Sequence, residues 1–379
     1  MQAYFDNSAT TKPLPEVVDA VTRAMTETWG NPSSLHAVGD AADQELEAAR
    51  RTLASAFGCK PQEVYFTGSG TESNNIAILG TVEALKRRGN RIVTTAVEHP
   101  SVKGCMKQLQ EEGFDVVWLP VDETGHVSEE AICDAVNEKT ILVSMMLVNN
   151  EVGSIMPVKA AAKALKRAGA PGYVHVDAVQ GFGKVPVGPK ALGADLISVS
   201  AHKVHGPKGV GALYVKKGIR LVSPVKGGGQ EDKVRPGTQG TPAIAGFAAA
   251  VDTGILHGDL NAYIAHVTEV RNIIRDAVLA TDIGAINSGD DALPYILNLS
   301  LEGIPSEVLR NYLSEQGVYV STGSACSKGH RSTVLTQMDL DPRRIDSAVR
   351  FSFSHTNTIE EARYAADVLT RAANTLRRG

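Results

Sequence analysis

Over about its first two thirds, the chain alternates short apolar segments with segments long enough to form helices. Short apolar segments bounded by glycine and polar residues are typical of buried strands. The expected strands are residues 63–67, 91–95, 115–119, 141–145, 173–176, 196–200 and 210–215. The helices expected between them include residues 73–88, 100–112, 129–137 and 158–168. Strands separated by helices build right-handed βαβ units, so the pattern predicts an α/β fold with a mostly parallel seven-stranded sheet flanked by helices.

The rest of the chain predicts a second, smaller α/β domain. Two amphipathic helices, residues 15–29 and 40–57, are expected before the first strand. Beyond Gly240 the expected elements are helices 243–256, 260–280, 306–315 and 359–376, and strands 283–287, 295–300 and 349–353. We therefore assign residues 14–255 to a large domain and residues 1–13 and 256–379 to a small domain.

Composition excludes several classes of function. The net charge of −4 is spread over interspersed charges of both signs, which argues against nucleic-acid binding. No apolar run reaches the length of about 20 residues that spans a bilayer, so no membrane association is expected. The N-terminus has no secretion signal, and the four cysteines form no C-x-x-C pair. These features predict a cytoplasmic protein with reduced thiols and no metal site.

A lysine directly follows one of the expected strands. Lys203 lies in the segment Ser198-Val199-Ser200-Ala201-His202-Lys203, among glycines that let the backbone approach a ligand. This placement suits Schiff-base chemistry, and Ser200 and His202 could hold a phosphate. In isolation, Lys203 would be read as a solvated loop residue. Asp177 ends the preceding expected strand, and a lysine with such an aspartate is the pair that pyridoxal phosphate needs.

Three further strand ends carry polar groups. The segment 66–74 contains Gly70 and Thr71 and joins a strand to a helix, where free N–H groups attract anions. His99 follows the next strand and could stack on a cofactor ring and move protons, although a helix cap is the simpler reading. Asn150 follows another strand and offers an amide donor. Because parallel strands end at the same edge of a sheet, these groups are expected at one site.

Together these segments resemble the cysteine desulfurases of the NifS/IscS type, in the aminotransferase class V group of the type I pyridoxal-phosphate fold. The resemblance covers nearly the whole chain. Beyond the motifs above, it rests on Tyr4-Phe5-Asp6-Asn7-Ser8-Ala9-Thr10-Thr11, Gly30-Asn31-Pro32-Ser33-Ser34, Gly227-Gly228-Gly229-Gln230-Glu231, Arg235-Pro236-Gly237-Thr238, Ser324-Ala325-Cys326-Ser327 and Val349-Arg350-Phe351-Ser352.

The resemblance implies a set of cofactor contacts in the large domain. Lys203 would carry pyridoxal 5'-phosphate as a Schiff base, and Asp177 would pair with the pyridine nitrogen. His99 would stack on the ring and act in acid–base steps, and Gln180 would contact the ring hydroxyl. The residues that would hold the phosphate are Gly70, Thr71, Ser200 and His202, with Thr238 reaching it from the second subunit of a homodimer.

The resemblance also implies the reaction. Asn150 and Arg350 would fix the carboxylate of L-cysteine, since arginine offers a two-pronged donor. Cys326, in a small-domain loop of about residues 321–335, would attack the substrate sulfur and pass it on to an acceptor such as an iron–sulfur scaffold. Lys328 or His330 could lower the pKa of its thiol. The other cysteines (Cys59, Cys105 and Cys133) are better read as structural.

Three alternatives stay open at this point. The first is selenocysteine lyase activity, which would use the same scaffold. The second is a class V aminotransferase acting on another amino acid, in which Cys326 would have no role. The third is a non-catalytic sulfur-transfer scaffold, which would not need a residue at every catalytic position. The chain also departs from the family pattern: Asp232 stands where an arginine is common, and residues 237–240 read Gly-Thr-Gln-Gly. The stretch from Cys326 to Arg350 is a few residues shorter than in many relatives. These departures affect the acceptor and the reach of the loop rather than the cofactor.

Overall fold

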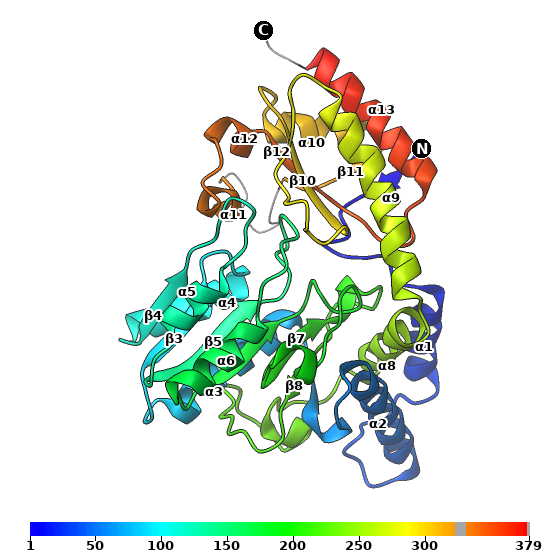
Figure 1. Ribbon diagram of the computed structural model, residues 1–379. Helices are drawn as coiled ribbons and strands as arrows, with labels where there is room; N and C mark the ends of the chain where they lie inside the picture. Colours follow the sequence, from blue (N-terminus) through cyan, green and yellow to red (C-terminus); the bar gives the residue numbers. More distant parts are fainter. Residues whose placement is uncertain (323–330, 377–379) are drawn as a thin grey trace.

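The computed structural model describes residues 1–322 and 331–376. Its largest element is a sheet of seven strands in the order β2-β8-β7-β6-β5-β3-β4 (Figure 1). The strands are β2 (Val64–Thr67), β3 (Arg91–Thr95), β4 (Asp115–Leu119), β5 (Thr140–Met146), β6 (Tyr173–Asp177), β7 (Leu196–Ser200) and β8 (Gly211–Val215). All seven lie within a residue or two of the expected strands, and the predicted fold class is confirmed.

One strand of this sheet runs against the others. β8 pairs antiparallel with β7 on one side and with β2 on the other, whereas the remaining pairs are parallel. A parallel connection needs a crossover of a dozen or more residues. The segment between β7 and β8 is shorter than that, because it holds only the short turn Ala201–Lys203 and a glycine-rich stretch. The chain therefore returns beside β7 in the opposite direction and places Lys203 in the reversal.

Helices pack on the faces of the sheet. They are α3 (Gly70–Leu85), α4 (Pro100–Glu111), α5 (Glu129–Ala135), α6 (Lys159–Ala168) and the short α7 (Pro189–Leu192). α3 begins three residues earlier than expected, because the Ser69 side chain accepts a hydrogen bond from Glu72 N–H and caps the helix there. The start of α3 therefore lies directly after β2, at the edge of the sheet where Lys203 is found.

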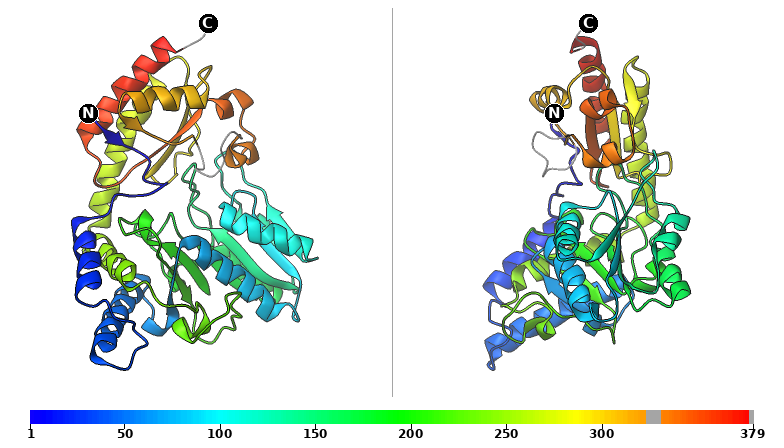
Figure 2. Two further views of the ribbon diagram at one scale, coloured as in Figure 1. Left: turned by 180° about the vertical axis from the view of Figure 1, so that it is seen from behind. Right: turned by 90° about the vertical axis from the view of Figure 1, so that its left-hand side faces the viewer.

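A smaller layer stands at the ends of the parallel strands (Figures 1 and 2). Its antiparallel sheet has the order β12-β10-β9 and is covered by helices. The elements are α9 (Leu260–Leu279), β9 (Gly284–Ile286), β10 (Ile296–Leu301), α10 (Ser306–Glu315), α11 (Thr333–Gln337), α12 (Pro342–Asp346), β12 (Ala348–Ser352) and α13 (Ile359–Thr375). The N-terminal β1 (Ala3–Tyr4) joins this layer by pairing with β11 (Val318–Tyr319).

Three further helices flank the large sheet on its β2 side. α1 (Pro15–Thr26) and α2 (Ala37–Phe57) both pack against α8 (Thr241–Val251). The helix expected over 243–256 is not continuous, since α8 ends at Val251 and a π-helical turn, η4 (Asp252–Leu256), follows it. Within the described residues, no helix is long and apolar enough to cross a membrane.

Candidate active site

A cavity of about 320 Å³ opens where the parallel strands of the large sheet end. Ten of the twelve site residues predicted from the sequence line it. These are Gly70, Thr71, His99, Asn150, Asp177, Gln180, Ser200, His202, Lys203 and Arg350. They come from the ends of β2, β3, β5, β6 and β7 and from β12 of the small layer. The edge of the sheet thus gathers groups that lie far apart in the sequence.

The Lys203 amine is buried at the wall of this cavity. It donates hydrogen bonds to the carbonyl oxygens of Ser8 and Ala9, the latter at 2.8 Å. Burial, together with the positive charges of Arg350 and Lys184, lowers the pKa of Lys203 to about 7. A lysine amine that is substantially neutral near pH 7 is a competent nucleophile toward an aldehyde.

Asp177, the last residue of β6, is held in place by two donors. Its Oδ2 accepts a hydrogen bond from Asn74 Nδ2 at 2.7 Å, and its Oδ1 accepts one from Val179 N–H at 3.0 Å. Only 6% of Asp177 is exposed. Asn74 also donates to Ser101 Oγ at 2.9 Å. The prediction from sequence missed Asn74 and Ser101 as site residues, although Asn74 lies in the glycine-containing segment that was singled out.

His99 caps α4 and has a defined tautomer. Its Nδ1 accepts a hydrogen bond from Ser101 N–H at 3.2 Å, so the proton of the neutral ring lies on Nε2. Nδ1 also lies 2.8 Å from Ser101 Oγ. Burial lowers the pKa of His99. His99 can therefore cap the helix and still take part in proton transfer, because Nδ1 makes the cap and Nε2 carries the proton.

An anion cradle forms where α3 begins. Gly70 is the first residue of this helix, and a Cβ atom there would meet Val179 Cγ2 at 2.7 Å. Ser200 and His202 approach from the end of β7. Burial lowers the pKa of His202 to about 4, and Lys203 and two further lysines contribute. The cradle thus offers free helix N–H groups, hydroxyls and a neutral imidazole, all of which suit a phosphate.

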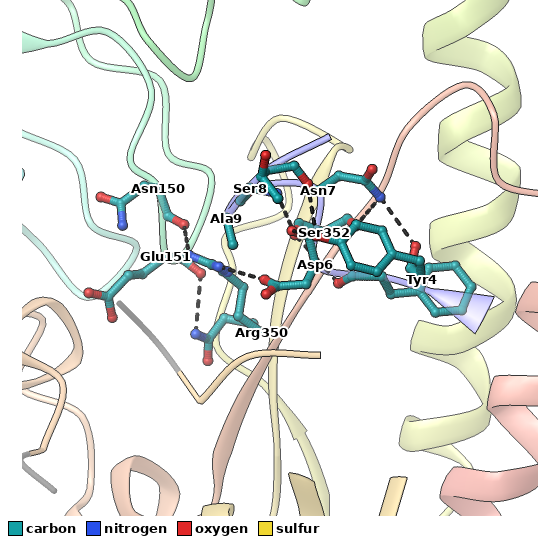
Figure 3. Close-up of polar contacts among 12 residues, drawn as sticks. Tyr4, Asp6, Asn7, Ser8, Ala9, Asn150, Glu151, Arg350 and Ser352 are labelled. Carbon is teal, nitrogen blue, oxygen red and sulfur yellow. Dashed lines mark hydrogen bonds and ion pairs between the residues drawn. The ribbon is translucent and has the colours of Figure 1, made fainter. Parts of the chain in front are cut away.

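Arg350 belongs to β12 and is 2% exposed. Figure 3 shows its guanidinium between two partners: Nη1 donates to the Asn150 carbonyl oxygen at 2.8 Å, and Nη2 forms an ion pair with Asp6 Oδ1 at 2.9 Å. Its Nε is buried without a hydrogen-bond partner among the described residues. Asp6 was not predicted as a site residue. The sequence pointed to Asp6 only through the N-terminal motif, residues 4–11, that this chain shares with the cysteine desulfurases.

Only one of the two polar atoms of the Gln180 side-chain amide has a hydrogen-bond partner among the described residues. Its Nε2 donates to the Ser8 carbonyl oxygen at 3.0 Å, while its Oε1 is buried and has no partner among the described residues. The Asn74 Oδ1 atom is likewise buried without a hydrogen-bond partner among the described residues. Buried polar atoms without partners are costly, so their presence beside a cavity indicates that a ligand completes them.

Two predicted residues lie outside this arrangement. Thr238 is exposed and does not line the cavity. Cys326 lies in residues 323–330, outside the described part of the chain. Both flanks of that segment are nevertheless attached at the cavity: Ser321 forms a β-bridge with Arg350, and Ser332 Oγ donates to Glu151 Oε2 at 2.5 Å, next to Asn150.

Comparison with known proteins agrees with this geometry. The family model described as aminotransferase class-V matches residues 3–364. A protein of Dictyoglomus turgidum named cysteine desulfurase IscS is 38% identical over 99% of this chain and 95% of its own length. A cysteine desulfurase IscS of Methanosarcina thermophila is 37% identical over 99% of this chain and 92% of its own length.

Solved structures give the same result. A NifS-like protein superimposes with a TM-score of 0.93 at 37% identity, covering 99% of this chain and all of the other. A structure described as SspA in complex with cysteine superimposes with a TM-score of 0.82 at 30% identity, covering 94% of this chain and 100% of the other. The fold is therefore shared with proteins that have these names.

Proposed function

The chain belongs to the aminotransferase class-V family, and from this premise we propose that it is a pyridoxal-phosphate-dependent cysteine desulfurase. It converts L-cysteine to L-alanine and transfers the sulfur to Cys326. The observation that carries the proposal is a single cavity that combines the Lys203 amine, the buried Asp177 carboxylate and the Arg350 guanidinium. Both ends of the segment that contains Cys326 are attached at its rim.

The residues of the cavity fit pyridoxal phosphate. Lys203 would hold the aldehyde carbon, Asp177 the pyridine nitrogen and Gln180 the ring hydroxyl. The phosphate would lie on the cradle of Gly70, Thr71, Ser200 and His202. When bound, the cofactor supplies a conjugated ring that withdraws electrons from the substrate. The unpartnered Gln180 Oε1 supports the assignment, because a ring hydroxyl beside it would complete its hydrogen bonding.

Arg350 and Asn150 would bind the substrate carboxylate. In this structure the Asp6 carboxylate occupies one side of the Arg350 guanidinium. Arginine binds a carboxylate best through two parallel N–H donors. The unpartnered Nε supplies one donor, and the substrate would share or replace the Asp6 contact for the other. Asp6 thereby keeps the buried guanidinium paired until substrate arrives.

His99 is the group that moves protons at the substrate. Its neutral ring carries a proton on Nε2, while Nδ1 is fixed by Ser101. Burial keeps the pKa of His99 below its usual value, so the ring stays neutral at physiological pH and can donate the Nε2 proton. The Lys203 amine, released when substrate takes its place, is a base within the same cavity.

Cys326 would take the sulfur. Five peptide steps separate it from Ser321, and an extended chain covers at most about 17 Å over that length. Its thiolate forms a new S–S bond with the substrate sulfur as the carbon–sulfur bond breaks, and the carbon keeps the electron pair and takes up a proton. The products are alanine and an enzyme persulfide. We propose that a sulfur-acceptor protein, such as an iron–sulfur scaffold, then takes the outer sulfur.

The test is substitution of Cys326 by serine. Cys326→Ser is expected to keep the visible absorbance of the bound cofactor and to form alanine from cysteine more than about a hundredfold more slowly, because the nucleophile is lost. Mass spectrometry of the unsubstituted protein after incubation with cysteine should find one added sulfur on the Cys326 peptide.

The matched control is Cys59→Ser. Burial raises the pKa of the Cys59 thiol to about 12, so this cysteine is a poor nucleophile and the variant should retain full activity. Undiminished alanine formation by Cys326→Ser would overturn the assigned nucleophile. Alanine formation that requires an oxo-acid co-substrate would indicate an aminotransferase instead.

A further inference from the structure

A second, smaller cavity touches Lys203 and shares no other lining residue with the active-site cavity. Its volume is about 30 Å³. It lies where the segment after β6, the π-helical turn η4, α9 and the end of β12 meet. The polar side chains that line it, besides Lys203, are Thr11, Lys184, His205, Tyr263, Tyr295, Ser354 and His355.

Lys184 is the unusual residue of this cavity. Only 7% of it is exposed, and among the described residues its amine has neither a hydrogen-bond nor an ion-pair partner. Within the described residues, the Lys184 amine lies over the ring of Tyr295, whose centroid is 5.6 Å from Nζ. A buried ammonium group without a counter-charge is costly, and such groups are normally paired.

The hydroxyl groups of Tyr295 and Tyr263 are also free. Tyr295 is 4% exposed, and in the described part of the chain neither hydroxyl has a hydrogen-bond partner. His205, in contrast, is satisfied, because its ring nitrogens contact the Lys12 carbonyl oxygen and Ser354 Oγ, each at 2.8 Å. The cavity therefore combines the Lys184 amine with two free hydroxyl groups, beside the His355 ring, whose pKa burial lowers to about 4.

The surrounding charges are predominantly positive. Burial and, after it, the charge of Arg350 lower the pKa of Lys184 to about 8. Burial and the charges of Arg350 and Lys184 lower the pKa of Lys203. The carboxylates in this region are already engaged: Asp6 pairs with Arg350, and Asp177 accepts from Asn74 and Val179. The charge of Lys184 is therefore opposed by that of Arg350 and, among the described residues, is not balanced by an ion pair.

We propose that this cavity binds a halide-sized monovalent anion, chloride in the cell, between the Lys184 amine and the hydroxyl of Tyr295. The cavity has room for about two water-sized particles, since one water needs about 10–15 Å³ measured in this way. This space suits a single-atom anion and is small for phosphate, sulfate or gluconate. The ammonium and the hydroxyl are the donors that such an anion needs.

A surface groove adjoins the cavity. A groove of about 420 Å³ runs along the end of α2 and the segment between β6 and α7, and it shares Gly183, Gly254 and Ile255 with the cavity. A Cβ atom on Gly183 would meet Ile255 Cδ1 at 3.0 Å, so the two segments pack closely there. Gly254 lies in η4, and π-helical turns frequently occur at functional sites.

The decisive experiment is a crystal structure of the holoenzyme soaked in sodium bromide. An anomalous peak is expected in the cavity, within contact distance of Lys184 Nζ, in the unsubstituted protein and in Lys190→Met. Lys190 is an exposed lysine that lines the neighbouring groove, which makes it a matched control. The peak should be absent from Lys184→Met. Density for water alone in the unsubstituted protein would overturn the proposal.

A solution measurement keeps the test independent of crystals. The melting temperature of the holoenzyme is compared in potassium chloride and in potassium gluconate at equal ionic strength, since gluconate is too large for the cavity. The stabilisation by chloride should be smaller in Lys184→Met and in Tyr295→Phe than in Lys190→Met. Equal chloride effects in all four proteins would contradict the site, even if one variant is itself destabilised.

Discussion

Lys203 shows how a single side chain takes its chemistry from its surroundings. Its amine is removed from water and lies near two other cations, so the charged form is disfavoured. The contacts with the Ser8 and Ala9 carbonyl oxygens hold it at the cavity wall. A lysine with this environment differs from the exposed Lys208 that lies a few residues further along the same turn.

The pH dependence of cofactor uptake follows from this environment. In chloride-free buffer, the rate at which apoprotein binds pyridoxal phosphate should rise with pH up to about 7 and then level off, because the amine is already neutral above its lowered pKa of about 7. At pH 8 the neutral fraction is roughly two- to three-hundredfold larger than for an unperturbed lysine. Stopped-flow absorbance measures the rate. A rate that keeps rising tenfold per unit above pH 9 would contradict the assigned environment.

The sequence allowed only some of the contacts at the active site to be predicted. Lys203, Asp177 and His99 each follow a strand, and parallel strands end at one edge, so their convergence was predictable. Asn74 reaches Asp177 across 103 positions, and Asp6 reaches Arg350 across 344. Neither contact has a local signal, because each depends on how distant elements pack. Thr238 and Cys326 were identified through the family resemblance, and their roles stay predictions.

At the scale of elements, the regular strands and helices were predictable and the irregular segments were not. β1 and β11 have two residues each and carry no periodicity to detect. The loop of residues 227–240 has an unusual backbone conformation, because Glu231, Asp232 and Lys233 all have positive φ angles. Positive φ is costly for residues other than glycine, so tertiary contacts must hold this turn.

The contact that holds it is a buried ion pair. Glu231 accepts two hydrogen bonds from Arg50, at 2.8 and 2.9 Å, and a third from Phe66 N–H at 2.8 Å. Glu231→Ala removes the buried carboxylate from this N–H and from Arg50, which keeps only Glu47 and the Val64 carbonyl oxygen among these partners. The variant should therefore lower the free energy of unfolding by about 3 kcal/mol, the lower end for a broken buried pair. Urea denaturation measures the loss.

The control for this prediction is Glu83→Ala. Glu83 pairs with Lys86 on the surface of α3, where both side chains are about half exposed, and exposed pairs contribute little. Its midpoint of denaturation should stay close to that of the unsubstituted protein. Equal stability of the two variants would show that the Glu231 pair does not hold the loop.

At the scale of the whole molecule, one of the predicted phosphate contacts lies outside the cavity of its own chain. Thr238 is exposed and outside the cavity, although the loop that carries it is tied to the start of α3 by the Arg235–Glu72 ion pair. Large apolar side chains are also exposed near the end of α1, with Met25 at 63% and Trp29 at 67%. Where such residues form a contiguous patch, they mark an interaction surface. We therefore propose a two-fold homodimer in which Thr238 completes the phosphate site of the partner chain.

Subunit complementation tests this arrangement. Thr238→Ala should bind pyridoxal phosphate more weakly, and Lys203→Ala should lack the covalent chromophore. A mixed dimer of the two variants, co-expressed with different tags and purified through both, contains one site with Lys203 from the first chain and Thr238 from the second. By symmetry that site is complete and the other is doubly defective, so the mixed dimer should retain about half of the normal cofactor absorbance after dialysis. If Thr238 instead served its own chain, neither site would be complete, and the mixed dimer would lose the cofactor as readily as Thr238→Ala alone.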